Sequence, residues 1–116
     1  LKDRGAVQSA DSEVKSGQVS VTIKDFKYIP AKIKVKKGTT VTWTNQDTIM
    51  HNVMLDHAGA GTPHDPPTKD KVDPTMLAGP LLAKGESYSF TFNSVDANPY
   101  HCSPHPSMRG SVEVVE

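Results

Sequence analysis

The sequence has almost no cysteine, no excess charge of either sign and no long apolar run. Its single cysteine, Cys102, excludes an intramolecular disulfide, so this thiol is an inert buried group, a nucleophile or a metal ligand. Thirteen basic residues balance thirteen acidic ones, and a neutral chain has no long-range field that would attract nucleic acid. No segment approaches the roughly 20 apolar residues that cross a bilayer. These absences argue against a nucleic-acid-binding protein and against a membrane span.

The length of 116 residues suits one domain with one core. Residues 1–17 are polar and without periodicity, and we expect them to form a flexible arm or linker. From residue 18 apolar and polar residues alternate, which is typical of strands with one buried and one solvated face. We therefore expect a folded domain over residues 18–116. The alternating runs lie at residues 19–24, 32–36, 40–44, 87–92 and 111–114.

Short strands separated by turns, with no convincing helical stretch, predict an all-β fold, and we expect an antiparallel β-sandwich. The segment from Asp56 to Leu82 breaks the alternation, because it contains five prolines and few apolar residues. A connection of this length is usually functional or mobile.

The pattern Cys102, His105, Met108 is the part of the sequence that carries chemistry. Residues 103–109 follow one expected strand and precede the last one, so we expect them to form a loop. The spacing of Cys102, His105 and Met108 lets the three donors turn toward one point. A thiolate, an imidazole and a thioether together suit a soft, redox-active metal. With a second histidine, the set becomes that of a blue-copper electron-transfer centre.

Five histidines are available to complete this set. His51 is the best candidate, because it begins a strand-like run directly after a turn. His101 neighbours Cys102 in an extended segment, so the two side chains point to opposite faces and His101 should miss the metal. His57 and His64 lie in the proline-rich segment and are expected to be solvated. The predicted copper ligands are His51, Cys102, His105 and Met108.

Other interpretations of these residues are weaker. A cysteine hydrolase could pair Cys102 with His51, but nothing in the local sequence resembles that of a protease nucleophile, and a small sandwich leaves little room for a substrate cleft. Structural zinc on cysteine and histidine would not explain Met108. Storage or delivery of copper without redox turnover remains the alternative to electron transfer, and an absorption spectrum separates the two.

Four segments of the chain resemble the cupredoxins, specifically the amicyanin and plastocyanin branch. They are Gly-Thr-Thr-Val-Thr-Trp-Thr-Asn (38–45), His-Asn-Val (51–53), Gly-Pro-Leu-Leu (79–82) and Tyr-His-Cys-Ser-Pro-His-Pro-Ser-Met-Arg-Gly (100–110). The last has the short ligand-loop spacing of amicyanin. The resemblance implies a Greek-key β-sandwich of about eight strands with one type 1 copper ion at one end.

The resemblance also implies roles for individual residues. His51, Cys102 and His105 would be equatorial ligands and Met108 the axial one, with the edge of His105 reaching solvent. Asn52 would brace the ligand loop, its backbone amide hydrogen-bonding the cysteine sulfur. A docking patch for redox partners would come from Ile49, Met50, Leu81, Leu82, Pro104 and Pro106.

The chain departs from amicyanin at several positions. Met50 stands where amicyanins have proline, Ser107 replaces a large aromatic residue, and the loop over residues 56–78 is longer. Methylamine dehydrogenase, the usual amicyanin donor, is therefore not assumed.

The resemblance implies a monomeric, periplasmic or otherwise extracytoplasmic electron carrier and not an enzyme. Such a carrier takes electrons from a dehydrogenase or quinol-linked donor and passes them to a cytochrome or oxidase. A soluble head of a larger redox protein, tethered through residues 1–17, is a further alternative.

Overall fold

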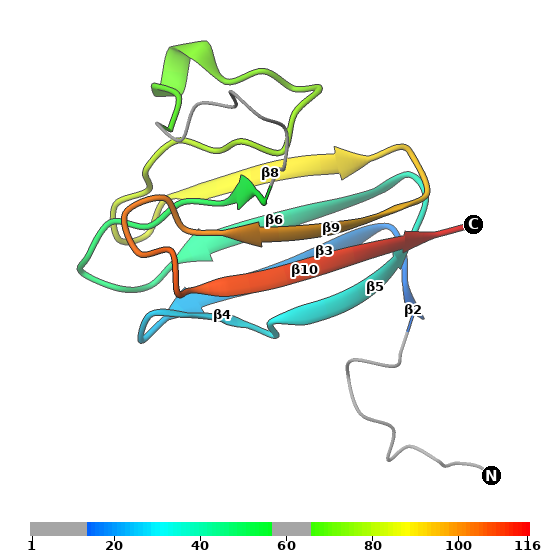
Figure 1. Cartoon of the computed structure of the whole chain (residues 1–116), viewed down its shortest axis with the longest axis horizontal. Helices are drawn as coiled ribbons and strands as arrows, with labels where there is room; N and C mark the ends of the chain where they lie inside the picture. Colours follow the sequence, from blue (N-terminus) through cyan, green and yellow to red (C-terminus); the bar gives the residue numbers. More distant parts are fainter. Residues whose placement is uncertain (1–13, 57–65) are drawn as a thin grey trace, which may run out of the picture.

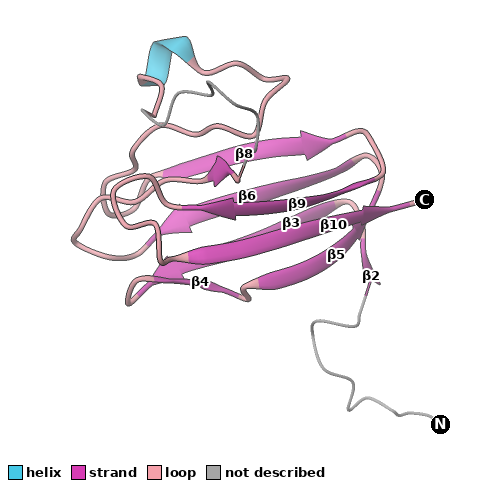
Figure 2. Cartoon of the chain, in the orientation of Figure 1, coloured by secondary structure: helices cyan, strands magenta, loops and turns pink. Residues whose placement is uncertain are grey.

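The computed structural model describes residues 14–56 and 66–116, which form two β-sheets packed as a sandwich (Figures 1 and 2). One sheet has five strands, in the order β2 (Val14–Lys15), β5 (Lys32–Lys36), β10 (Arg109–Val115), β9 (Asp96–His101) and β7 (Met54–Leu55). The other has four, in the order β4 (Lys27–Ile29), β3 (Gln18–Lys24), β6 (Thr39–Asn45) and β8 (Ser87–Phe92). A short 3₁₀-helix, η2 (Lys69–Lys71), lies in the connection between β7 and β8. The predicted all-β sandwich is confirmed.

The alternating runs became the long strands, and their apolar residues face the interior. In β3 the buried residues are Val19, Val21 and Ile23, and in β6 the buried apolar residues are Val41 and Trp43. The outward face of the four-stranded sheet instead has hydroxyls that pair across β6 and β8, as in Thr42 with Ser89 at 2.7 Å. The period of two therefore determined which face of each strand is buried.

The sheets are mixed, so the expectation of purely antiparallel pairing was wrong. Strand β3 pairs with β6 in parallel, and β10 pairs with β5 in parallel. The chain crosses between sheets after β4 and again after β5, so strands that are not consecutive in sequence become neighbours. Alternation specifies a buried face but carries no information about the direction of the neighbouring strand.

The described residues contain nine strands, one more than the expected eight or so. Strands β2, β4 and β7 have only two or three residues, too few to produce a readable alternation. Strand β2 pairs with β5, so the folded domain already includes Val14 and the expected boundary at residue 18 is too late. Residues 1–13 of the expected arm lie outside the described residues.

A cluster of aromatic rings fills the core between the sheets. Trp43 donates its indole N–H to the hydroxyl of Tyr100 at 3.1 Å, and the rings of Tyr28 and Tyr100 meet edge to face at 4.7 Å. Tyr88 stacks on Trp43 at 5.9 Å between ring centroids. All these residues are buried, so the apolar ring faces contribute to the core while the polar tips find hydrogen-bond partners.

This burial predicts a loss of stability at alkaline pH. Burial raises the pKa of Tyr100 and of Tyr88 from the ordinary 10.0 to about 12, and burial also raises the pKa of Tyr28. The folded state thus holds phenol protons that the unfolded chain releases near pH 10. The resulting stabilisation is complete below pH 10 and is lost as the pH rises toward 12. We expect ultraviolet titration to show tyrosinate only together with unfolding; a tyrosinate signal well below the unfolding transition would contradict this.

Loops from four parts of the chain meet at one end of the sandwich, on the left in Figure 1. They are the β3–β4 turn, the segment after β6, the segment before β8 and the β9–β10 loop. Within residues 14–56 and 66–116, no helix is long and apolar enough to span a membrane. The loops at this end contain all the predicted metal ligands.

Candidate metal centre

The β9–β10 loop, which carries three of the predicted donors, is a tight turn closed by its own backbone hydrogen bonds. Cys102 follows directly after β9, and Met108 directly precedes β10. The amide of His105 donates to the carbonyl of Cys102 at 3.3 Å, and the amide of Met108 donates to the carbonyl of His105 at 2.9 Å. The amide of Cys102 closes the loop onto the carbonyl of Met108 at 3.2 Å. Each of the first two bonds joins residues three positions apart, so the loop consists of two successive turns with a predicted donor at each end.

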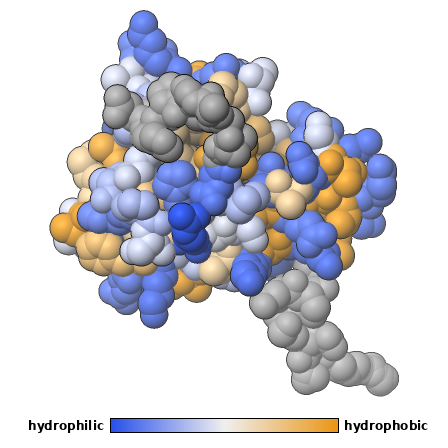
Figure 3. All heavy atoms as spheres, in the orientation of Figure 1, coloured by the Kyte–Doolittle hydropathy of each residue, from blue (hydrophilic) through white to orange (hydrophobic). Residues whose placement is uncertain are grey.

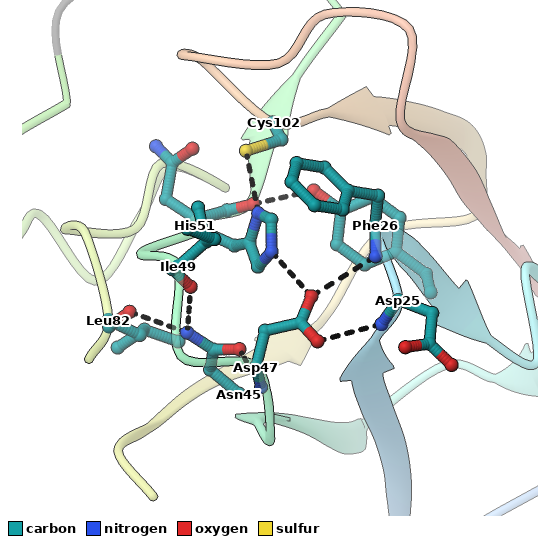
Figure 4. A network of polar contacts seen from close by, with 10 residues as sticks. Asp25, Phe26, Asn45, Asp47, Ile49, His51, Leu82 and Cys102 are labelled. Atoms are coloured by element: carbon teal, nitrogen blue, oxygen red, sulfur yellow. Dashed lines mark hydrogen bonds and ion pairs between the residues drawn. The ribbon is translucent and has the colours of Figure 1, made fainter. Parts of the chain in front are cut away.

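His51 reaches the same point from the connection between β6 and β7. The sequence suggested a regular strand at His51, but the structure has only an isolated bridge there. His51 pairs with Leu82, whose amide donates to the carbonyl of His51 at 2.8 Å. Its side chain is fully buried, and its Nδ1 lies 3.7 Å from Sγ of Cys102 (Figure 4). Two residues 51 positions apart in the sequence therefore place a nitrogen and a sulfur side by side in the interior.

Met108 and His105 occupy different surroundings. Met108 is 3% exposed and lies clustered with His51 and Cys102. His105 is half-buried, and its ring meets that of His51 with 5.3 Å between centroids. In the described part of the chain, no three histidine, cysteine or acidic side chains converge tightly enough to hold an ion without a further donor. The described residues thus place His105 beside the cluster, not inside it.

Asn52 ties the two halves of the cluster together. Its side-chain oxygen accepts the amide of Ser103 at 2.7 Å, and its nitrogen donates to the carbonyl of Gly79 at 3.0 Å. Its own carbonyl accepts the hydroxyl of Tyr28 at 2.5 Å. The loop that carries His51 is therefore bonded to the loop that carries Cys102, which fixes the separation of their side chains.

The sulfur of Cys102 lies in a pocket that excludes water but offers two backbone amides. Burial raises the pKa of the Cys102 thiol, and hydrogen bonds from the amides of Asn52 and His105 offset part of that increase. The thiol therefore stays protonated in the protein alone, and a bound cation is needed to displace its proton. The two amides are already in place to donate hydrogen bonds to a thiolate.

A carboxylate that the sequence reading missed orients the ring of His51. Oδ2 of Asp47 lies 2.8 Å from Nε2 of His51, and the amide of Asp47 donates to Oδ1 of Asn45 at 2.8 Å. In a neutral ring whose Nε2 donates to this carboxylate, the lone pair lies on Nδ1, the nitrogen that faces Cys102. Metal-binding histidines commonly have such a carboxylate, so an acidic residue four positions before His51 was the available signal.

The donor set fits a first-row metal ion. Zinc, which is close to copper in size, lies about 2.0 Å from a histidine nitrogen and about 2.3 Å from a cysteine sulfur. At tetrahedral to trigonal angles these bonds place nitrogen and sulfur ~3.5–3.7 Å apart. The observed 3.7 Å between His51 and Cys102 falls in this range. One thiolate, imidazole nitrogen and a buried thioether are the donors that select copper among such ions.

The remaining predicted residues have other positions. His101 points away from the sulfur and pairs its Nδ1 with Asp56 at 2.7 Å, while His57 and His64 lie outside the described residues. Leu82 is 2% exposed, so the expectation that it contributes to a surface patch was wrong: its backbone bridge to His51 turns its side chain into the core. Leu81 is half-buried, and the exposed members of the expected patch are Ile49, Met50, Pro104 and Pro106.

Comparison with known proteins agrees with this geometry. The model of the copper-binding proteins of the plastocyanin/azurin family matches residues 15–115. Amicyanin from Paracoccus denitrificans is 37% identical over 118 aligned positions, covering 98% of this chain and 81% of the relative. Plastocyanin from Scenedesmus fuscus is 31% identical over 73% of this chain and 83% of its own length.

The likeness extends to solved structures. The structure of a reduced amicyanin mutant superimposes with a TM-score of 0.66 at 36% identity, covering 90% of this chain and 88% of that one. The family match includes the loop after β6 and the β9–β10 loop, and therefore every donor of the cluster. The chain belongs to the plastocyanin/azurin family of copper-binding proteins.

Proposed function

We propose that the protein is a small blue-copper electron carrier. The observation that supports this most directly is the buried pair of His51 Nδ1 and Cys102 Sγ, 3.7 Å apart in a frame of the protein's own hydrogen bonds. The relatives that it resembles, amicyanins and plastocyanins, are electron carriers and not enzymes. The copper would be held by His51, Cys102, His105 and Met108.

Bound copper would supply a one-electron couple between Cu(II) and Cu(I). The contribution of the chain is to keep the donors still. Asn52 fixes the distance between the two loops, and Asp47 fixes the ring of His51, so the donor positions do not depend on the metal. A site whose ligands move little between oxidation states has little to reorganise, and electron exchange is fast for that reason.

Electrons would enter and leave at the loop end of the sandwich. His105 is the half-buried donor, and the loops at this end also carry Ile49 and Met50, each 44% exposed, with Pro104 and Pro106 at the surface. Figure 3 shows apolar residues at this left-hand end of the molecule. An apolar rim of this kind suits brief contact with protein partners. The donor would be a dehydrogenase or quinol-linked protein and the acceptor a cytochrome or oxidase, outside the cytoplasm.

An absorption spectrum tests the proposal. The oxidised, copper-loaded protein is expected to absorb intensely near about 600 nm, as a short thiolate–copper bond of this geometry requires, and to bleach reversibly on reduction. Adding zinc instead of copper is the control, because zinc has no redox change and gives no colour. A colourless Cu(I) protein that resists oxidation would instead favour copper storage or delivery. A copper-loaded protein silent in both states would contradict the proposal.

A further inference from the structure

The turn between β3 and β4 has an unusual residue in a strained position. Lys24 pairs with Lys27, which leaves Asp25 and Phe26 as the two central residues of the turn. Both have left-handed backbone angles, with φ of 53° and 59°. Hairpins of this kind favour Asn-Gly or Asp-Gly, and a bulky residue at positive φ is a genuine outlier. Phenylalanine therefore destabilises this turn where glycine or asparagine would not.

Burial in the core does not compensate for this strain. The side chain of Phe26 is 47% exposed and lies outside the core cluster. Strain of this type persists where the surrounding structure requires it and is concentrated at functional sites. The contacts of the ring should therefore reveal what the strained turn is for.

The ring of Phe26 packs against both histidines of the candidate site. It meets the ring of His51 edge to face, with 5.1 Å between centroids and 80° between planes. It meets the ring of His105 in the same way, at 4.9 Å and 79°. The two imidazoles are themselves 5.3 Å apart. Phe26 is thus the third member of a group of three rings, and it lies on the solvent side of the two donors.

The carboxylate that orients His51 also fixes this turn. Asp47 accepts the amide of Asp25 at 2.8 Å and the amide of Phe26 at 3.1 Å, in addition to Nε2 of His51 (Figure 4). Its side chain is only 13% exposed, so these charge-assisted bonds are shielded from water. One carboxylate therefore joins the strained turn directly to the buried donor and sets where the phenyl ring lies.

We propose that Phe26 is a positioning residue of the metal centre, held in a strained turn so that its ring confines the imidazole of His105 beside His51. The proposal rests on the assignment of both histidines as copper donors. It explains why a strained aromatic residue is kept at the surface. The ligand loop fixes the backbone of His105, and within the described residues its ring makes aromatic contacts with Phe26 and His51.

Replacing Phe26 by asparagine separates two effects of this residue: the strain that it places on the turn and the contact that its ring makes with His105. Asparagine tolerates positive φ and keeps the amide that Asp47 binds. We expect the thermal midpoint of the metal-free protein to rise by about 2–5 °C. At the same time, NMR relaxation of the metal-free protein should show a more mobile His105 ring. Copper release to a chelator should become about tenfold faster, as for loss of other residues that support a ligand. We therefore expect the variant to have a more stable fold and a less stable copper site than the wild-type protein.

Two variants serve as controls. Asp25→Gly relieves strain at the neighbouring position without altering the ring, so it should stabilise the protein and leave copper release unchanged. Phe26→Leu retains an apolar side chain but lacks the ring, and it should loosen His105 as asparagine does.

The proposal is wrong if Phe26→Asn lowers the thermal midpoint, or if ring mobility and copper release stay at wild-type values. If wild-type protein fails to form a blue centre, the proposed function fails, and the two measurements on metal-free protein still decide the role of Phe26.

Discussion

Replacing Cys102 by serine is expected to abolish the visible absorption of the copper-loaded protein. The colour requires a thiolate–copper bond, and a serine hydroxyl is neither soft nor deprotonated at neutral pH. Loss of a residue that merely supports a ligand costs about 10–100-fold in metal affinity, so loss of this direct donor should exceed about 100-fold. The spectrum and a competitive chelator titration measure the two effects.

The fold should tolerate this change. The amides of Asn52 and His105 that hydrogen-bond the sulfur can also donate to a serine oxygen, so the buried hydroxyl has partners. Met76→Leu is a matched control, because it removes a sulfur that is 52% exposed and lies in the connection before β8. It should leave colour and affinity unchanged. If Cys102→Ser keeps the absorption band, the thiolate is not a copper ligand and the assignment of the centre is wrong.

The sequence was sufficient to predict the long strands and their buried faces, because these depend on local pattern. Alternation in 19–24 and 40–44 predicted strands with the correct buried faces, because a strand with one wet face must repeat every two residues. The same rule could not detect β7, which has two residues, or the parallel pairing of β3 with β6. Strand length and partner direction are decided by the two sheets together, not by any one segment.

The candidate site divides in the same way. Cys102, His105 and Met108 lie within seven residues, so their spacing predicted that they converge, and His51 was predicted because it begins a strand-like run directly after a turn. Phe26 gave no such signal, because its role arises from contacts between separate loops. For Asp47 the signal was local and was missed: an acidic residue four positions before His51. A local trace of Phe26 did exist: Asp-Phe fills a hairpin position where glycine is expected at the second residue.

Leu82 was wrongly predicted to belong to an exposed patch, and its position in an apolar run explains why. Two adjacent leucines before β8 suggested one exposed patch, yet neighbouring side chains in an extended segment point to opposite sides. The bridge between Leu82 and His51 decides which of the two is inside. This pairing joins two segments 31 residues apart, so the burial of Leu82 is not visible in the local sequence.

Gly110→Ala is expected to lower the stability of the fold strongly, because the added methyl group has no room. A Cβ at position 110 would lie 2.5 Å from Oη of Tyr100, 2.6 Å from Cζ and 2.8 Å from the carbonyl oxygen of Ala31. Tyr100 is fully buried and cannot swing aside, since its hydroxyl accepts the indole N–H of Trp43. Overpacking of this type costs about 1–3 kcal/mol, which corresponds to a thermal midpoint lower by roughly 4–15 °C.

Pairing this change with Tyr100→Phe shows whether the clash is the cause. Removing the hydroxyl relieves the shortest of the three contacts but leaves the ring carbon and the Ala31 carbonyl in place. The double variant should therefore be less destabilised than the sum of the single changes, with a coupling of about 0.5–3 kcal/mol, and yet remain below wild type. Ser111→Ala, the next position along β10, removes an oxygen without adding a clash and should shift the midpoint far less. Additive effects of the two changes, or a Gly110→Ala protein as stable as wild type, would mean that β9 and β10 can separate here. In that case the position of Tyr100, two residues before Cys102, would not be set by this close approach of the strands.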